Sequence, residues 1–71
     1  MSDLLLSVNG ESLAMAEGCT IADVVARVAG CSEPRGMAVA VDRAVIPRSE
    51  WDRTPARAGT RIEVVTAAAG G

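Results

Sequence analysis

TIADVVARVAG, residues 20–30, predicts an amphipathic helix, and the rest of this 71-residue chain can be interpreted around it. Thr20 is a suitable N-cap residue, and Asp23 follows three positions later, as in a capping box. Apolar residues then recur at helical spacing and form one stripe, made of Ile21, Val24, Val25 and Val28. Gly30 can end the helix in the left-handed conformation. Because valine is a poor helix former, packing of this stripe on a sheet must stabilise the helix.

A hairpin is predicted immediately before the helix. Residues 4–8 and 11–16 have the composition of two short strands, and Asn9-Gly10 between them favours a two-residue turn with positive φ. Leu13 and Met15 lie on one face of the second strand because side chains alternate along a strand. Glu17-Gly18 ends this strand before the helix begins.

Three further strands are predicted after the helix. Residues 37–41 place Met37, Val39 and Val41 on one face and two alanines on the other. A turn at residues 42–43 leads into a short strand over 44–46, which a proline ends because it cannot donate to a strand ladder. Residues 48–59 are predicted to be irregular, and residues 60–65 form the last strand, with Ile62 and Val64 facing the core. The order ββαβββ predicts an α+β domain with one helix packed across a mixed sheet.

The composition argues against chemistry performed by the chain itself. His, Lys and Tyr are absent, which excludes a histidine base, a Schiff-base lysine and a Cys/His zinc site. No glycine-rich loop with the spacing of a nucleotide-binding motif is present in the sequence. We therefore expect no catalytic residue, no metal ligand and no cofactor bound by this chain.

Charge and hydropathy narrow the possible partners and location. The net charge is −2, and the seven basic residues are all arginines spread from Arg27 to Arg61. Nucleic-acid binding uses clustered positive charge or aromatic platforms, and Trp51 is the one aromatic residue. No apolar run approaches the ~20 residues of a membrane span, and the N-terminus lacks the basic region of a signal peptide. The sequence predicts no nucleic-acid or membrane partner and a cytoplasmic location with reduced thiols.

The last six residues are predicted to have a function of their own. We expect a folded domain over residues 1–65 and a flexible tail over residues 66–71. The tail is uncharged and ends in two glycines, and its last five residues are Ala67, Ala68, Ala69, Gly70 and Gly71. Six extended residues reach up to ~20 Å, far enough to thread into the active site of a partner enzyme. Glycine lacks Cβ, so a narrow channel can close around this backbone and a nucleophile can reach the terminal carbonyl. The Gly71 carboxylate is ionised at neutral pH, so a partner must activate it.

Short segments in a fixed order connect the chain to a known family. They are Val8-Asn9-Gly10, Cys19-Thr20-Ile21, residues 37–42, Val45-Ile46-Pro47-Arg48 with Trp51, Gly59, residues 62–65 and Gly70-Gly71. Together they resemble the thiamin-pathway sulfur carriers of the ThiS family, which have the β-grasp, ubiquitin-like fold. The Ile-Pro-Arg-x-x-Trp segment resembles the thiamin branch more than the related molybdopterin branch. Thr60 and the plain alanine tail depart from the family pattern.

The resemblance implies that the chain is a protein substrate and not an enzyme. An ATP-dependent adenylyltransferase, similar to ubiquitin-activating (E1) enzymes, would adenylate the Gly71 carboxylate. A persulfide-bearing sulfurtransferase system would then displace AMP and leave a thiocarboxylate, whose sulfur thiazole synthase takes for the thiazole ring of thiamin. ATP and its metal would belong to the activating partner.

A docking surface can be predicted next to the tail. If Ile62 and Val64 face the core, Val65 faces outward, and so do Ala38 and Ala40 on the middle strand. The resemblance to a β-grasp fold implies that these two strands lie close together. Small exposed apolar residues beside the tail would form a shallow docking patch for partner enzymes.

The sequence leaves several alternatives open. The chain can instead be a ubiquitin-like modifier joined through Gly71 to other proteins, a sulfur carrier for molybdopterin or sulfur amino-acid synthesis, or a plain interaction domain. Cys19 precedes the helix, where the helix dipole can lower a thiol pKa, but packing is the favoured interpretation. Cys31 is interpreted as a packing or surface thiol, and Trp51 as a residue of the core or its edge. Arg48 can pair with a nearby acid or contact a partner.

Overall fold

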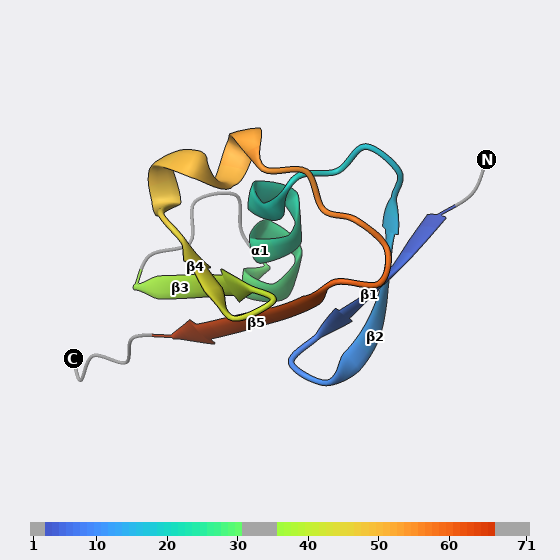
Figure 1. Cartoon of the computed structure of the whole chain (residues 1–71), viewed down its shortest axis with the longest axis horizontal. Coiled ribbons are helices and arrows are strands. Elements are labelled where there is room, and N and C mark those ends of the chain that lie inside the picture. Colours follow the sequence, from blue (N-terminus) through green and yellow to red (C-terminus); the bar gives the residue numbers. More distant parts are fainter. Residues whose placement is uncertain (1–2, 31–35, 67–71) are drawn as a thin grey trace.

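The computed structural model describes residues 3–30 and 36–66 and shows a mixed five-stranded sheet with one α-helix across it (Figure 1). The strand order is β2-β1-β5-β3-β4, in which β1 and β5 run parallel and the other neighbours antiparallel. This confirms the predicted α+β class and the β-grasp arrangement. The elements are β1 (Asp3–Val8), β2 (Glu11–Ala16), α1 (Ile21–Ala29), β3 (Met37–Val41), β4 (Ala44–Ile46), the 3₁₀ helix η1 (Arg48–Arg53) and β5 (Arg61–Thr66).

Helix α1 begins and ends at the predicted residues. The Thr20 hydroxyl accepts a hydrogen bond from the Asp23 backbone N–H at 3.3 Å, and the Asp23 carboxylate accepts one from the Thr20 N–H at 2.9 Å. This reciprocal pair is a capping box. Gly30 ends the helix at φ 78°, and its N–H donates to the carbonyl of Ala26. Local side chains therefore fix both ends of the helix.

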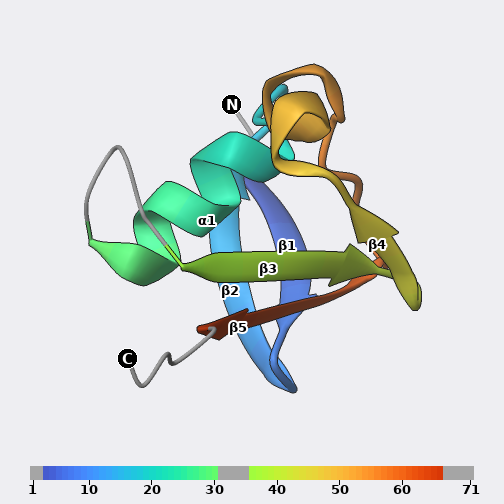
Figure 2. The ribbon, with the colours of Figure 1, turned by 90° about the vertical axis from the view of Figure 1, so that its left-hand side faces the viewer.

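Helix α1 lies across one face of the sheet, as Figure 2 shows from the side, and most of its apolar stripe belongs to the core cluster. Ile21, Val24 and Val25 are fully buried against strand residues that include Leu6, Val39 and Ile62. Val28 was predicted to share this burial, but it is 41% exposed. Its side chain, one turn beyond Val24 and Val25, faces a hollow lined by the β1–β2 hairpin.

Both tight turns have two consecutive residues with positive φ, the pattern of a type I′ turn. Asn9 and Gly10 join β1 to β2 with φ values of 53° and 83°, which confirms the predicted hairpin. Asp42 and Arg43 join β3 to β4 at 51° and 75°. Such turns match the right-handed twist of the strands that they connect.

The prediction that residues 48–59 are irregular is wrong in its first half, because Arg48–Arg53 form η1. Trp51 is buried in this element, and its Nε1 donates to the carbonyl of Ile46 at 2.9 Å. The guanidinium of Arg48 lies 5.4 Å from the centre of the Trp51 ring. The structure thus confirms that Trp51 belongs to the core, and it shows a contact of Arg48 that was not among the predicted alternatives, a cation–π contact with Trp51.

Candidate functional site

Strand β5 connects the folded body to the predicted tail, and it is an interior strand of the sheet. It pairs with β1 on one side through Ser7–Arg61 and Val8–Ile62. On the other side, β5 pairs with the whole of β3, from Val41–Ile62 to Met37–Thr66. The strand therefore includes Thr66, which the sequence had assigned to the tail. The remaining tail residues lie outside the described part of the chain: Ala67, Ala68, Ala69, Gly70 and Gly71.

The predicted docking residues come together on the outer face of the sheet, which is the face opposite α1. Val65 is 57% exposed and pairs with Ala38 on β3. Ala40 lies one pleat further along β3, opposite Glu63, and is partly exposed. The structure confirms that these side chains share one surface at the end of β5.

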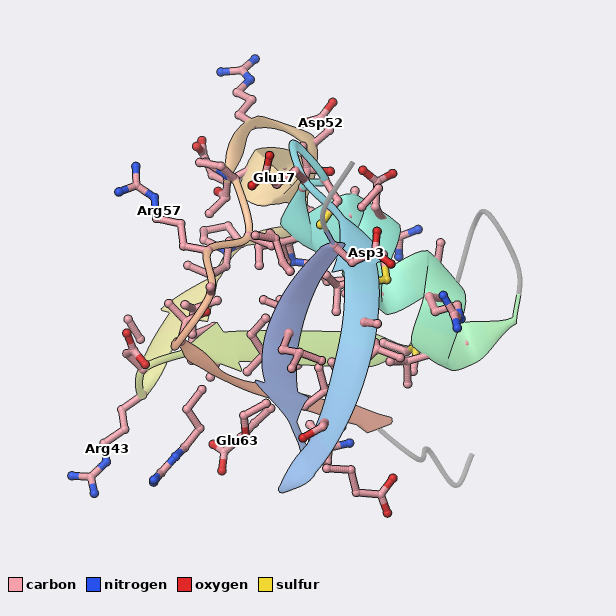
Figure 3. The ribbon with its side chains drawn as sticks, turned by 90° about the vertical axis from the view of Figure 1, so that its right-hand side faces the viewer. Asp3, Glu17, Arg43, Asp52, Arg57 and Glu63 are labelled. Atoms are coloured by element: carbon pink, nitrogen blue, oxygen red, sulfur yellow. The ribbon has the colours of Figure 1, made fainter. Side chains whose placement is uncertain are left out.

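Two residues of this surface were missed in the sequence. Val45 on β4 is 73% exposed and pairs with Ala40. Glu63 places a carboxylate among the apolar side chains, and Figure 3 shows it extending away from the body. A shallow hollow of about 170 Å³ lies on this surface. We call the surface the outer patch, and it is formed by Ala38, Ala40, Val45, Glu63 and Val65.

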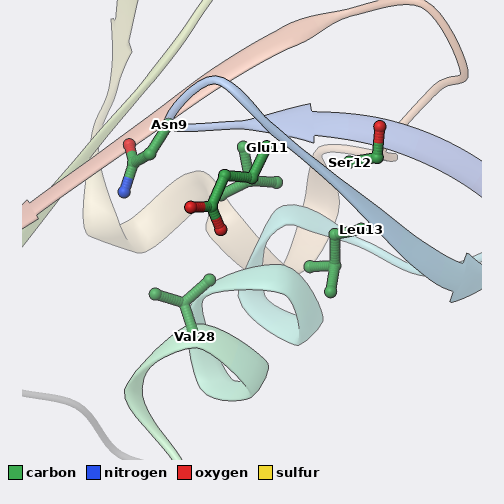
Figure 4. Close-up of a pocket in the computed structure, with 6 residues that line it drawn as sticks. Asn9, Glu11, Ser12, Leu13 and Val28 are labelled. Atoms are coloured by element: carbon green, nitrogen blue, oxygen red, sulfur yellow. The ribbon is translucent and has the colours of Figure 1, made fainter.

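Two other hollows in the described residues are each lined by a carboxylate. One of about 250 Å³ lies between the hairpin and α1, where Glu11, Leu13 and Val28 face it (Figure 4). Another, of about 260 Å³, is lined by Asp42, Arg43, Gly59 and Arg61. Within residues 3–30 and 36–66, no three His, Cys, Asp or Glu side chains are placed to hold a metal ion.

Comparisons with known proteins give the family and support the fold. A sequence profile described as the ThiS family matches residues 5–71. The chain belongs to the ThiS family. The solved structure of the thiamine biosynthesis protein ThiS from Geobacter metallireducens is similar to it, with a TM-score of 0.76 and 21% sequence identity. The similarity covers 96% of this chain and 100% of the Geobacter chain. No curated protein matches the chain.

The ThiS family match over residues 5–71 includes both parts of the candidate site. It contains the outer patch on β3, β4 and β5, and it continues through Gly70-Gly71. In the described part of this ThiS-family chain, no helix is long and apolar enough to cross a membrane.

The thiol of Cys19 is buried beside the helix cap in this ThiS-family chain. Burial raises the pKa of Cys19, and the negative charge of Asp23 raises it further. Asp23 also belongs to the capping box, so the group that caps the helix opposes a thiolate beside it. Cys19 is buried in the core cluster, which agrees with the packing interpretation favoured from the sequence, whereas Cys31 lies outside the described residues.

Proposed function

We propose that this chain is a sulfur carrier of thiamin biosynthesis, which carries sulfur as a thiocarboxylate on Gly71. Membership in the ThiS family supports the carrier role, and the family match that continues through Gly70-Gly71 is the observation that carries the proposal. The outer patch supports it independently, because it provides a docking surface at the end of the strand that leads into the tail.

The chemistry follows from what the chain has and lacks. A carboxylate is a poor electrophile, so an ATP-dependent adenylyltransferase must first convert the Gly71 carboxylate into an acyl adenylate, with pyrophosphate as leaving group. The terminal sulfur of a protein persulfide then attacks the acyl carbon and AMP departs. A second thiol attacks the sulfurtransferase sulfur of the resulting acyl disulfide, so that a new disulfide forms between those two cysteines and the thiocarboxylate leaves. Thiazole synthase is the proposed acceptor of this sulfur, and ATP with its metal ion belongs to the activating partner.

The carrier itself binds the activating enzyme and delivers its C-terminal tail to the adenylation site. The outer patch docks on the activating enzyme through small side chains. A basic group on that enzyme would complement the negative charge of the Glu63 carboxylate. Residues 67–71 reach at most ~18 Å when extended. The adenylation site must therefore open within about that distance of Thr66 on the docked enzyme. A cytoplasmic location remains a prediction.

Intact mass spectrometry tests the proposal. The carrier is incubated with its candidate activating enzyme, ATP and a persulfide donor, beside a variant that lacks Gly71. A mass gain that corresponds to exchange of one oxygen for sulfur, absent from the variant, would support the carrier function. Sulfur transfer to thiazole synthase, and not to the large subunit of molybdopterin synthase, would then identify the pathway. Isopeptide-linked adducts to other proteins would instead support the modifier alternative.

A further inference from the structure

Asn9, predicted only as a turn residue, makes three hydrogen bonds to β5. Its backbone N–H donates to the carbonyl of Ile62 at 2.9 Å. Its side-chain Oδ1 accepts from the N–H of Val64 at 2.9 Å, and its Nδ2 donates to the carbonyl of Val64 at 3.1 Å. Figure 4 shows Asn9 at the tip of the hairpin. We call the two side-chain bonds the Asn9 clamp.

The clamp extends the sheet beyond the point where β1 turns back. Backbone pairing between β1 and β5 ends at Val8–Ile62. A side-chain amide carries a donor and an acceptor as a peptide group does, so the Asn9 side chain takes the place of the missing strand opposite Val64. Asparagine also tolerates the φ of 53° at this position better than most residues. One side chain therefore serves both the turn and the end of β5.

The position of the clamp connects it to the tail. Val64 directly precedes Val65 of the outer patch, and Thr66 then ends the strand. On the β3 side, the same segment is held by the pairs Ala38–Val65 and Met37–Thr66. The clamp thus supplies hydrogen bonds to β5 on its β1 side, two residues before the end of the strand.

We propose that Asn9 is a positioning residue for activation of the tail, an inference that rests on the proposed function. By holding Val64 on the β1 side, it keeps the end of β5 in line with the sheet up to Thr66, after which the tail begins. When the clamp opens, only the pairs with β3 hold the end of β5, so Val65 and Thr66 are less firmly positioned for the activating enzyme. The apparent affinity for the activating enzyme falls with the fraction of molecules in the closed form.

Two variants and one matched control test this role. Asn9→Gly keeps a residue suited to positive φ and removes the amide. Asn9→Asp keeps an acceptor for the Val64 N–H but turns a carboxylate oxygen toward the Val64 carbonyl. Asp42→Gly is the control, because Asp42 also has positive φ in a turn and accepts from the Arg61 N–H at 3.0 Å. It removes a similar side-chain bond from the opposite end of the same strand.

Steady-state adenylation and amide hydrogen exchange are measured on the full chain. Both Asn9 variants should raise the KM for the carrier about five- to tenfold while kcat stays within about twofold, as loss of one or two net hydrogen bonds implies. Exchange of the Val64 amide should accelerate about tenfold relative to that of Val24 in α1. Asp42→Gly should have the KM of the wild type.

Each contrary result overturns the inference. A wild-type KM in both Asn9 variants means that the clamp does not position the tail. An equal rise in KM for Asn9→Gly and Asp42→Gly means that β5 is only loosened in general. If the wild type is not adenylated at all, the proposed function fails, and unchanged exchange of Val64 in the Asn9 variants would refute the clamp separately.

Discussion

Val65→Asp should weaken docking to the activating enzyme without unfolding the carrier. Val65 is 57% exposed on the outer patch, so its replacement leaves the core intact. The cost to the fold is the lower strand propensity of aspartate, about 1 kcal/mol or less. A circular dichroism melt should therefore show a cooperative transition close to that of the wild type.

The loss of docking can be estimated from this exposure. Burial of a whole valine side chain is worth about 1.5–3 kcal/mol, so covering the exposed part of Val65 contributes about 1–1.5 kcal/mol. Aspartate loses this contribution and adds at least about 1 kcal/mol for desolvation of its carboxylate. A total of about 2–3 kcal/mol corresponds to a rise of roughly 30- to 150-fold in the KM for the carrier.

Release of pyrophosphate at increasing carrier concentration measures this KM. Leu5→Asp is the matched control, because Leu5 is 64% exposed on β1. The parallel register of β1 and β5 places Leu5 beside the residues that come before Arg61, the first residue of β5. Leu5 lies about 20 Å along the strand direction from Val65. A wild-type KM for Val65→Asp, or an equal loss for Leu5→Asp, would refute the assignment of the outer patch.

Further predictions concern the core and the buried thiol. Trp51→Phe should lower the free energy of unfolding by about 1–2 kcal/mol, because it leaves the Ile46 carbonyl without its donor, and urea unfolding measures the loss. Burial and Asp23 raise the pKa of Cys19 above the ordinary 9.0, so the unfolded chain releases this proton first as the pH rises. Stability should therefore be lost above about pH 9 in the wild type and less so in Cys19→Ala, as denaturation at several pH values would show. Asp23→Asn should lower the pKa of Cys19, so that alkylation at a fixed pH becomes faster, and an unchanged rate would contradict the assigned cause.

The parts of the fold that local residues determine could be predicted from the sequence. The capping box of Thr20 and Asp23, the Asn9-Gly10 turn and the alternation of Ile62 and Val64 each act over a few residues. Element η1 could not be predicted in this way. It has no repeating apolar pattern, and Trp51 holds it through the carbonyl of Ile46 and burial in the core.

The candidate site also has parts that local residues determine and parts that depend on distant contacts. Alternation along single strands predicts the outward direction of Val65, Ala38 and Ala40. The same alternation places Glu63 on the face of Val65, because it lies two residues earlier on β5, although Glu63 was not among the predicted docking residues. That Val45 joins them depends on the register of β4 against β3, which a strand does not encode by itself. The second role of Asn9 is harder still to predict, since its amide bonds to a residue 55 positions away.

The interior position of β5 has a consequence for how the molecule assembles. The hairpins β1–β2 and β3–β4 can form from neighbouring residues, but their facing edges stay unpaired until β5 enters between them. Closure of the sheet is therefore a late event of high contact order, for which nearly the whole chain must have been synthesised. A chain interrupted before β5 would have two hairpins without the strand that joins them, and its outer patch would lack Glu63 and Val65. Partner enzymes thus meet the complete docking surface only on molecules whose tail-bearing strand is already in place.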